Sequence, residues 1–237
     1  MRILSITFLF CLFAISANAQ LDRTEKKLAS WVDEHNEEAL TLLKDLININ
    51  SGTMNFEGVK EVADALIPKF QAIGMDSRFI DGSAWNRAGH LVAKIQGGKG
   101  PNILMIGHLD TVFEPDSPFQ EWSQVDDNMI KGPGIADMKG GDVIILQALS
   151  ALEARGFLKD MNVWVVMTGD EEKSGRPLSE SKKALIEAAK WADISLGFEN
   201  GDGDPATVNV ARRSSSDWTL TITGKAAHSS QIFKPEV

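Results

Sequence analysis

Apolar residues along the chain recur with two periods, which predict an alternation of helices and strands. Apolar residues three and four positions apart, the spacing of one helix face, predict helices in the segments 21–50, 59–70, 140–156 and 179–191. Short apolar runs between glycine, proline or polar residues predict strands at 90–95, 102–107, 162–169 and 194–199. Several of these strands are apolar throughout, which is typical of strands covered on both faces. The sequence therefore predicts an α/β fold with a mostly parallel sheet sandwiched by helices.

The pattern changes near residue 213. The segment "SDWTLTITG" (216–224) alternates apolar and polar residues, as in a sheet with one face exposed to water. This change indicates that one domain ends and a second begins near residue 213.

The first residues form a separate segment. Arg2 precedes an apolar run over 3–15, and residues 17–19 (Ala-Asn-Ala) have the small-x-small form of a cleavage site. This pattern predicts a secretory signal peptide, residues 1–19, and a mature protein that is periplasmic or secreted. A membrane anchor is the alternative, but the run is shorter than the roughly 20 residues that span a bilayer. The single cysteine, Cys11, lies in this segment, so we expect neither a disulfide nor membrane attachment after cleavage.

Composition narrows the class of partner. Hydrophobic residues make up 43% and charged residues 24% of the 237 positions, which suits a soluble protein with a large core. The formal net charge of −9 argues against a nucleic-acid partner, since phosphate backbones need a basic surface. A nucleotide-binding α/β protein would need a phosphate-binding glycine loop, and "GPGIADMKGG" does not match that motif.

Acids and one histidine follow the predicted strands, at the edge where active sites of parallel sheets lie. They are His108, Asp110, Asp170, Glu171, Glu172 and Glu199, joined by Asp137 in a glycine-rich turn that opens a helix. Any one of them could be a solvated loop residue or a helix cap. Together they would repel and raise one another's pKa unless a cation compensates. Carboxylate oxygen and imidazole nitrogen are suitable zinc ligands, so the pattern indicates a metal site.

Five motifs then appear in order along the chain: "GHLDTV", "GPGIADMKGG", "TGDEEKSG", "GFE" and "GKAAHSS". In this order they resemble the dizinc carboxypeptidase/aminoacylase family of metallopeptidases, and among its members bacterial glutamate carboxypeptidase most of all. The resemblance implies a zinc exopeptidase-like catalytic domain over 20–212. It also implies that 213–237 begins an α+β lid domain through which two subunits form a homodimer.

The resemblance implies a role for each metal-site residue. His108 would bind zinc, Asp110 would orient its imidazole ring, and Asp137 would bridge two zinc ions. Glu172 would be a terminal ligand of one zinc ion and Glu199 of the other. The peptide bond Asp137–Met138 is expected to be cis, as is usual in that family.

The implied activity is zinc-dependent hydrolysis of a peptide or amide bond by metal-activated water. Glu171 would act as the general base, and His228 in the lid would bind the substrate oxyanion. The substrates would be small peptides or N-acyl amino acids, from which the protein would release a C-terminal, glutamate-like amino acid or an N-acyl group.

One ligand of that family has no counterpart in the sequence. The family completes its two-zinc site with a second histidine beyond the lid, whereas His35 lies in a polar helix and His90 opens a strand, where no metal role is expected. We therefore expect the chain to be the N-terminal part of a longer protein. The alternative is a non-catalytic or degenerate metal-binding relative, with one metal ion or none.

Overall fold

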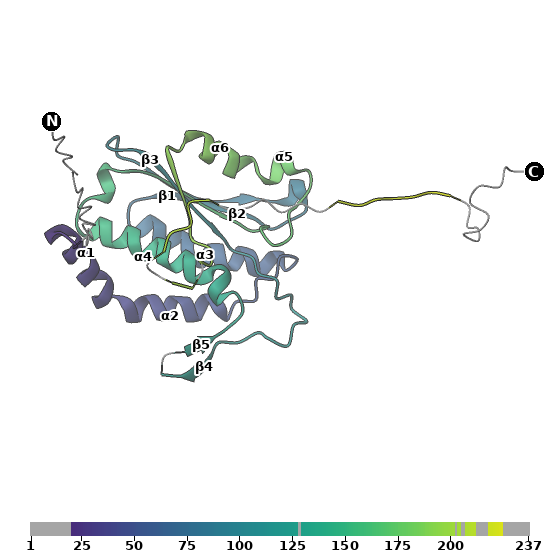
Figure 1. Cartoon of the computed structure of the whole chain (residues 1–237), viewed down its shortest axis with the longest axis horizontal. Helices are drawn as coiled ribbons and strands as arrows, with labels where there is room; N and C mark the ends of the chain where they lie inside the picture. The colour runs from purple at the N-terminus through teal and green to yellow at the C-terminus, as the bar shows by residue number, and fades with distance from the viewer. Residues whose placement is uncertain (1–19, 128, 202, 205–206, 212–217, 225–237) are drawn as a thin grey trace, which may run out of the picture. The chain divides into compact units, whose positions relative to one another are not determined.

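A five-stranded sheet organises the part of the chain that the structure describes. The computed structural model describes residues 20–127, 129–201, 203–204, 207–211 and 218–224. The chain divides into two units, 1–200 and 201–237, and every described helix and strand belongs to the first unit. The strand order in the sheet is β1-β2-β6-β3-β7 (Figure 1). The strands are, in that order, Asp76–Asp81, Gly89–Gln96, Asn162–Thr168, Asn102–His108 and Ile194–Gly197.

Strand directions confirm the mostly parallel sheet. β3 runs parallel to both of its neighbours, β6 and β7, whereas β2 runs antiparallel to both β1 and β6. Four strands therefore share one direction, and β2 alone is reversed. In the parallel part, His108 at the end of β3 pairs with Thr168 at the end of β6, so these two strands end at the same edge.

Helices cover both faces of this sheet (Figure 1). The described α-helices are α1 (Arg23–Glu34), α2 (Asn36–Ile47), α3 (Phe56–Ala72), α4 (Gly140–Ala154), α5 (Leu178–Ser181) and α6 (Lys183–Trp191). Three short turns are η1 (Ser83–Trp85), η2 (Ile135–Lys139) and η3 (Leu158–Asp160). A separate two-stranded hairpin consists of β4 (Ser123–Asp126) and β5 (Met129–Lys131).

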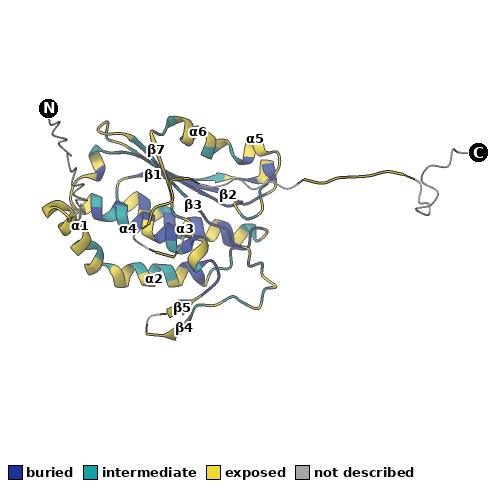
Figure 2. Cartoon of the chain, in the orientation of Figure 1, coloured by how far each residue is buried: buried dark blue, intermediate teal, exposed yellow. Residues whose placement is uncertain are grey.

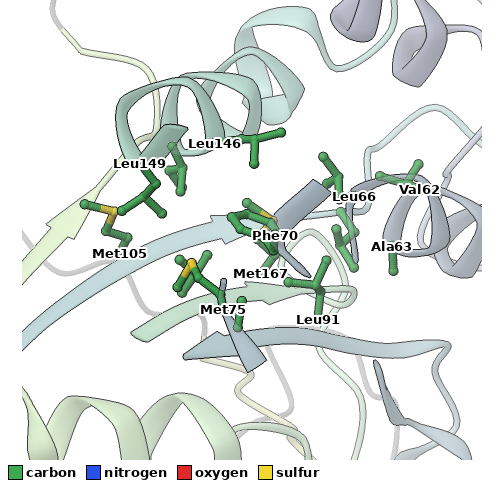
Figure 3. Packing of buried hydrophobic residues seen from close by; sticks show 14 of the residues in the cluster. Val62, Ala63, Leu66, Phe70, Met75, Leu91, Met105, Leu146, Leu149 and Met167 are labelled. Carbon is green, nitrogen blue, oxygen red and sulfur yellow. The ribbon is translucent and has the colours of Figure 1, made fainter. Parts of the chain in front are cut away.

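The larger core cluster lies between the sheet and the helices α2, α3 and α4. Leu66 and Phe70 of α3 and Leu149 of α4 pack in the same cluster as Leu91 and Met167 of the sheet, all of them buried (Figure 3). Figure 2 shows that the central strands and the inner sides of α3 and α4 hold most of the buried residues. The helix-spaced apolar positions of the sequence are thus the ones that face the sheet.

A second, smaller cluster lies on the opposite face. It joins Val92, Leu104 and Val166 of the sheet with Ala188 of α6. Leu91 and Val92 are adjacent in β2 yet belong to different clusters, because successive side chains of a strand point to opposite faces. This explains why the strands are apolar throughout, and it confirms the sandwich of helices around the sheet.

Four local details differ from the sequence prediction. The helix expected over 21–50 is broken at His35 into α1 and α2, and the helix expected over 179–191 is broken at Lys182 into α5 and α6. The edge strand β1 and the hairpin β4–β5 were not predicted. β1 has a polar sequence, DSRFID, and is a strand because its backbone pairs with β2 along its whole length.

Three further observations concern the two ends of the chain and the length of its helices. The predicted signal peptide, residues 1–19, lies outside the described residues. Of the alternating segment, residues 218–224 are described, and they form neither helix nor strand. Alternation makes a strand only where a neighbour accepts its hydrogen bonds, and no described strand pairs with this segment. Among the described helices, none has the length and apolar character required to cross a bilayer.

Candidate metal centre

The candidate site lies at the edge where β3, β6 and β7 end. β3 ends at His108, the turn after β6 carries Glu171 and Glu172, and Glu199 follows β7 by two residues. Asp137 comes from η2, a distorted turn before α4 in which its backbone angles are not helical. The peptide bond Asp137–Met138 is cis, as the resemblance predicted.

His108 is the centre of this group of side chains. Its Nε2 atom lies 2.9 Å from Oδ1 of Asp137 and 3.4 Å from Oε1 of Glu199. His108, Asp137 and Glu199 each offer one ligand atom, and these atoms lie within 4.8 Å of one another. His108, Glu171 and Glu172 form a second such group. The two overlapping triads bring together five of the six site residues that the sequence predicted in the described part of the chain.

The sixth residue, Asp110, contacts His108 and the turn that carries Glu171 and Glu172. It is fully buried, and its backbone carbonyl lies 2.9 Å from Nδ1 of His108, whereas its carboxylate Oδ1 is 3.6 Å from the same atom. The closer contact to the imidazole is therefore made by the backbone carbonyl of Asp110. With the proton on Nδ1, this contact leaves Nε2 free to face the carboxylates.

The carboxylate of Asp110 has its own partners. It accepts a hydrogen bond of 2.7 Å from the hydroxyl of Thr53, and it accepts the backbone N–H groups of Glu171 at 3.1 Å and Glu172 at 3.2 Å. One side chain after β3 thus holds the backbone of the turn after β6 that carries both glutamates.

The electrostatics of the site are dominated by negative charge around His108. Burial disfavours the charged imidazole, but a hydrogen bond to Glu199 and the charges of Asp110, Glu199 and Asp142 outweigh burial and raise the pKa of His108 to about 10. A protonated imidazole is therefore the cation that these carboxylates favour when no other cation is present.

The two glutamates show the same excess of negative charge. Burial, followed by the charge of Asp137, raises the pKa of Glu172 to about 7, and burial likewise raises the pKa of Glu171. Imidazole nitrogen and carboxylate oxygen are the donor types of zinc sites, and here they converge with an excess of negative charge. The residues present therefore fit a divalent metal ion, with His108, Asp137, Glu172 and Glu199 as the residues that would hold it.

Residues that the sequence reasoning did not assign hold the turn after β6. Asp170, the first of the three consecutive acids, is fully buried and accepts the N–H of Gly175 at 2.8 Å and the Nζ of Lys182 at 2.9 Å. Nδ1 of His90 accepts the N–H of Gly169 at 3.2 Å, and Arg87 donates to the carbonyl of Lys173 at 2.7 Å. Asp170 therefore points into the protein, while Glu171 and Glu172 reach the metal centre.

The sequence also did not predict a role for two buried charged residues, Lys139 directly before α4 and Asp142 within it. Lys139 donates to the carbonyl oxygens of Leu46 and Ile49, both at 2.8 Å, and so satisfies backbone groups at the end of α2. Asp142 is fully buried, and neither of its carboxylate oxygens has a hydrogen-bond partner among the described residues. Burial raises the pKa of Asp142 well above the ordinary value of an aspartate.

The remaining histidines have other places. His35 stacks on Trp31 at the junction of α1 and α2, with 3.9 Å between the ring centroids, and His90 is bound into the turn after β6. His228, the predicted oxyanion-binding residue, lies outside the described residues.

Fold and side-chain cluster together define a class: an α/β catalytic domain of the metallopeptidase type. The family model for "Peptidase family M20/M25/M40" matches residues 104–221, which include all the metal-site residues described above. The chain belongs to this family.

Curated relatives agree with this assignment. Carboxypeptidase G2 of Pseudomonas sp. (strain RS-16) is 27% identical over 214 residues, covering 90% of this chain and 51% of that protein. Succinyl-diaminopimelate desuccinylase of Methylobacterium radiotolerans is 32% identical over 208 residues, covering 84% of this chain and 52% of that protein. The chain thus spans about half the length of the curated relatives it matches.

Solved structures share the fold. Human carnosine dipeptidase 1 aligns with a TM-score of 0.62 at 19% identity, covering 74% of this chain and 41% of that chain. The M20 family metallo-carboxypeptidase Sso-CP2 from Sulfolobus solfataricus aligns with a TM-score of 0.55 at 23% identity, covering 69% of this chain and 38% of that chain. Both confirm the exopeptidase-like α/β architecture.

Proposed function

We propose that the protein is a zinc-dependent exopeptidase or amidohydrolase. It hydrolyses small peptides or N-acyl amino acids and releases a C-terminal, glutamate-like amino acid or an N-acyl group. The observation that carries this proposal is the pair of donor triads that share His108 at the end of β3. The names of the relatives, a carboxypeptidase, a desuccinylase and a dipeptidase, support hydrolysis of a peptide or amide bond.

We propose that the complete site would hold two zinc ions. His108, Asp137 and Glu199 would hold one ion, and Asp137 and Glu172 would contribute to the second. Zinc held there would supply Lewis acidity toward the scissile carbonyl group and toward the attacking water.

Glu171 is the proposed general base. Its backbone N–H is held by Asp110, and its carboxylate lies in the second triad, beside but outside the group formed by His108, Asp137 and Glu199. From this position it accepts a proton from the attacking water and returns that proton to the leaving amine. His228 is the proposed donor to the oxyanion.

The remaining parts of the proposal concern the whole protein. The predicted leader over 1–19 supports a periplasmic or secreted location, and the likeness of 213–237 to the start of a lid supports a homodimer. Sedimentation of the full-length protein and N-terminal sequencing of the secreted form test these two points.

A single substitution tests the mechanism. Glu171→Gln in the full-length protein should abolish turnover of peptides and acyl amino acids while two zinc ions per chain remain by elemental analysis. Glu187→Gln on the exposed side of α6 is the matched control and should change neither quantity. Retained turnover in Glu171→Gln would exclude Glu171 as the base.

A second candidate function is metal binding without catalysis. It is favoured by one observation: of the three histidines in the described residues, His108 alone belongs to the donor triads. A full-length protein that binds one metal ion or none, and that hydrolyses no member of an amide panel, would establish this candidate instead.

A further inference from the structure

We propose that a cavity next to the metal centre is a subsite for an uncharged aromatic or branched apolar group beside the scissile amide of the substrate. The cavity has a volume of about 360 Å³, and its walls include Phe113, Phe119, Ile130, Ile135, Asp137 and Glu172. The inference rests on the proposed function, because it assigns the cavity to the substrate of the same site.

The position of the cavity supports this assignment. Asp137 and Glu172 belong both to its wall and to the two donor triads around His108. A group in the cavity therefore lies directly beside the metal centre, as a substituent adjacent to the reacting bond must. The volume falls within the roughly 300–1,000 Å³ of pockets that bind small molecules.

The chemistry of the walls selects the kind of group. Phe113 and Phe119 meet edge to face, with ring centroids 5.1 Å apart, and the aliphatic side chains of Ile130 and Ile135 also line the cavity. Aromatic rings pack favourably with another ring in such edge-to-face arrangements. Val112, which is 62% exposed, also lines the cavity.

The walls named for the cavity offer an acidic group little to bind. Asp137 and Glu172 line the side next to the metal centre, where the proposed zinc ions would engage their carboxylates. Lys131 also lines the cavity, but its side chain is exposed to water. A neutral ring or branched alkyl group suits these walls better than a carboxylate does.

The wall that carries the two phenylalanines is fixed by hydrogen bonds. The amide of Asn50 donates to the carbonyl of Phe113 at 3.0 Å and to Oε1 of Gln120 at 2.6 Å. The amide of Gln120 donates in turn to the carbonyls of Glu114 at 2.8 Å and Ser117 at 2.9 Å. These contacts hold the loop from 113 to 120 in place, so the cavity is formed before any ligand binds.

Direct binding of small neutral amides tests the subsite independently of turnover. Benzamide and acetamide share the amide group, so the ratio of their affinities for the full-length protein, measured by ligand-observed NMR, reports the contribution of the ring. We expect benzamide to bind at least tenfold more tightly than acetamide. Phe119→Ala should abolish this ratio, and Val112→Glu, at an exposed position, should reduce it as well.

The matched control is Phe157→Ala. Phe157 is 42% exposed and precedes β6, at the opposite edge of the sheet from the metal centre. Its removal should leave the ratio unchanged. Equal binding of the two amides would overturn the proposal. This result is also expected if another part of the full-length protein fills the cavity. A ratio that persists in both Phe119→Ala and Val112→Glu would overturn the proposal as well.

Turnover provides the second arm. Two matched substrate series place a phenyl, methyl or carboxyl group either on the acyl side or on the amino-acid side of the amide. We expect kcat/KM to favour phenyl at least tenfold in one of the series, with the preference lost in Phe119→Ala. No phenyl preference in either series, in a protein that does turn substrates over, would overturn the subsite. A protein that turns over no substrate refutes the proposed function, and the amide-binding ratio then still decides whether the cavity binds rings.

Discussion

Replacing His90 with alanine should lower the free energy of unfolding by about 4 kcal/mol, because this side chain joins three segments of the fold. His90 is 1% exposed at the start of β2. Its Nε2 donates to the carbonyl of Ser181 at 2.7 Å, its Nδ1 accepts the N–H of Gly169 at 3.2 Å, and its ring stacks on Trp85 with 5.1 Å between centroids.

The magnitude follows from what alanine leaves behind. Each of the two buried backbone partners would lose its hydrogen bond at a cost of about 1–3 kcal/mol. Loss of the stacked pair adds about 0.5–1.5 kcal/mol. Urea denaturation of the full-length protein measures the sum. His35→Ala is the matched control, since His35 also stacks on a tryptophan but is only half-buried, and it should cost about 1 kcal/mol or less.

The contribution of His90 should also depend on pH. Burial is the main reason that the pKa of His90 is lowered, opposed by the charge of Asp170 and reinforced by that of Lys182. The unfolded chain therefore takes up a proton on this histidine near pH 6.5 while the folded protein does not, so stability is lost as the pH falls below about 6.5. His90→Gln keeps a donor and an acceptor but cannot titrate, so wild type should lose stability relative to this variant between pH 7.5 and 5.

Two results would refute this reasoning. A cost below about 1 kcal/mol for His90→Ala would mean that water or a local rearrangement replaces both hydrogen bonds. An unchanged stability difference between wild type and His90→Gln from pH 7.5 to 5 would mean that folding does not lower the pKa of His90.

Two further predictions concern the support of the two glutamates. Lys182→Met should destabilise the protein by about 3–5 kcal/mol in urea denaturation, because it leaves the fully buried carboxylate of Asp170 without its cation; the exposed Lys183→Met should cost little, and equal effects of the two variants would contradict the argument. Asp110→Asn should weaken zinc binding about 10- to 100-fold in a chelator competition, since the amide cannot accept every hydrogen bond that the carboxylate accepts. Thr53→Val should change the affinity in the same direction but by less, and an unaltered zinc affinity in Asp110→Asn would show that the turn after β6 holds its own shape.

The sequence was a good guide wherever one segment alone determines the outcome. The face of α3 that carries Leu66 and Phe70 is readable from spacing, and the strands around Val166 are readable from their uniform apolar character. His108 and Glu199 could be placed together because both follow strands of one sheet. β1 could not be found in this way, since its strand character comes from pairing with β2 rather than from its own residues.

The parts of the site that the sequence did not reveal depend on contacts between distant segments. His90 and Ser181 are 91 positions apart, and Arg87 reaches a carbonyl 86 positions away. Residue type alone did not separate Asp170 from its two neighbours. The motif resemblance assigned roles to Glu171 and Glu172, but only the fold shows that Asp170 is buried. Burial and partner, rather than residue type, distinguish them.

Asp110 links the two halves of the metal centre in a way that has a consequence for variation. The backbone carbonyl of Asp110 positions the imidazole ring of His108 at the end of β3. The carboxylate of the same residue positions the backbone of Glu171 and Glu172 after β6. The distance between the imidazole after β3 and the glutamates after β6 therefore cannot change by movement of one ligand residue alone. A change that shifts Asp110 moves both sets together, so the site should tolerate drift of the surrounding loops while its internal dimensions stay constant.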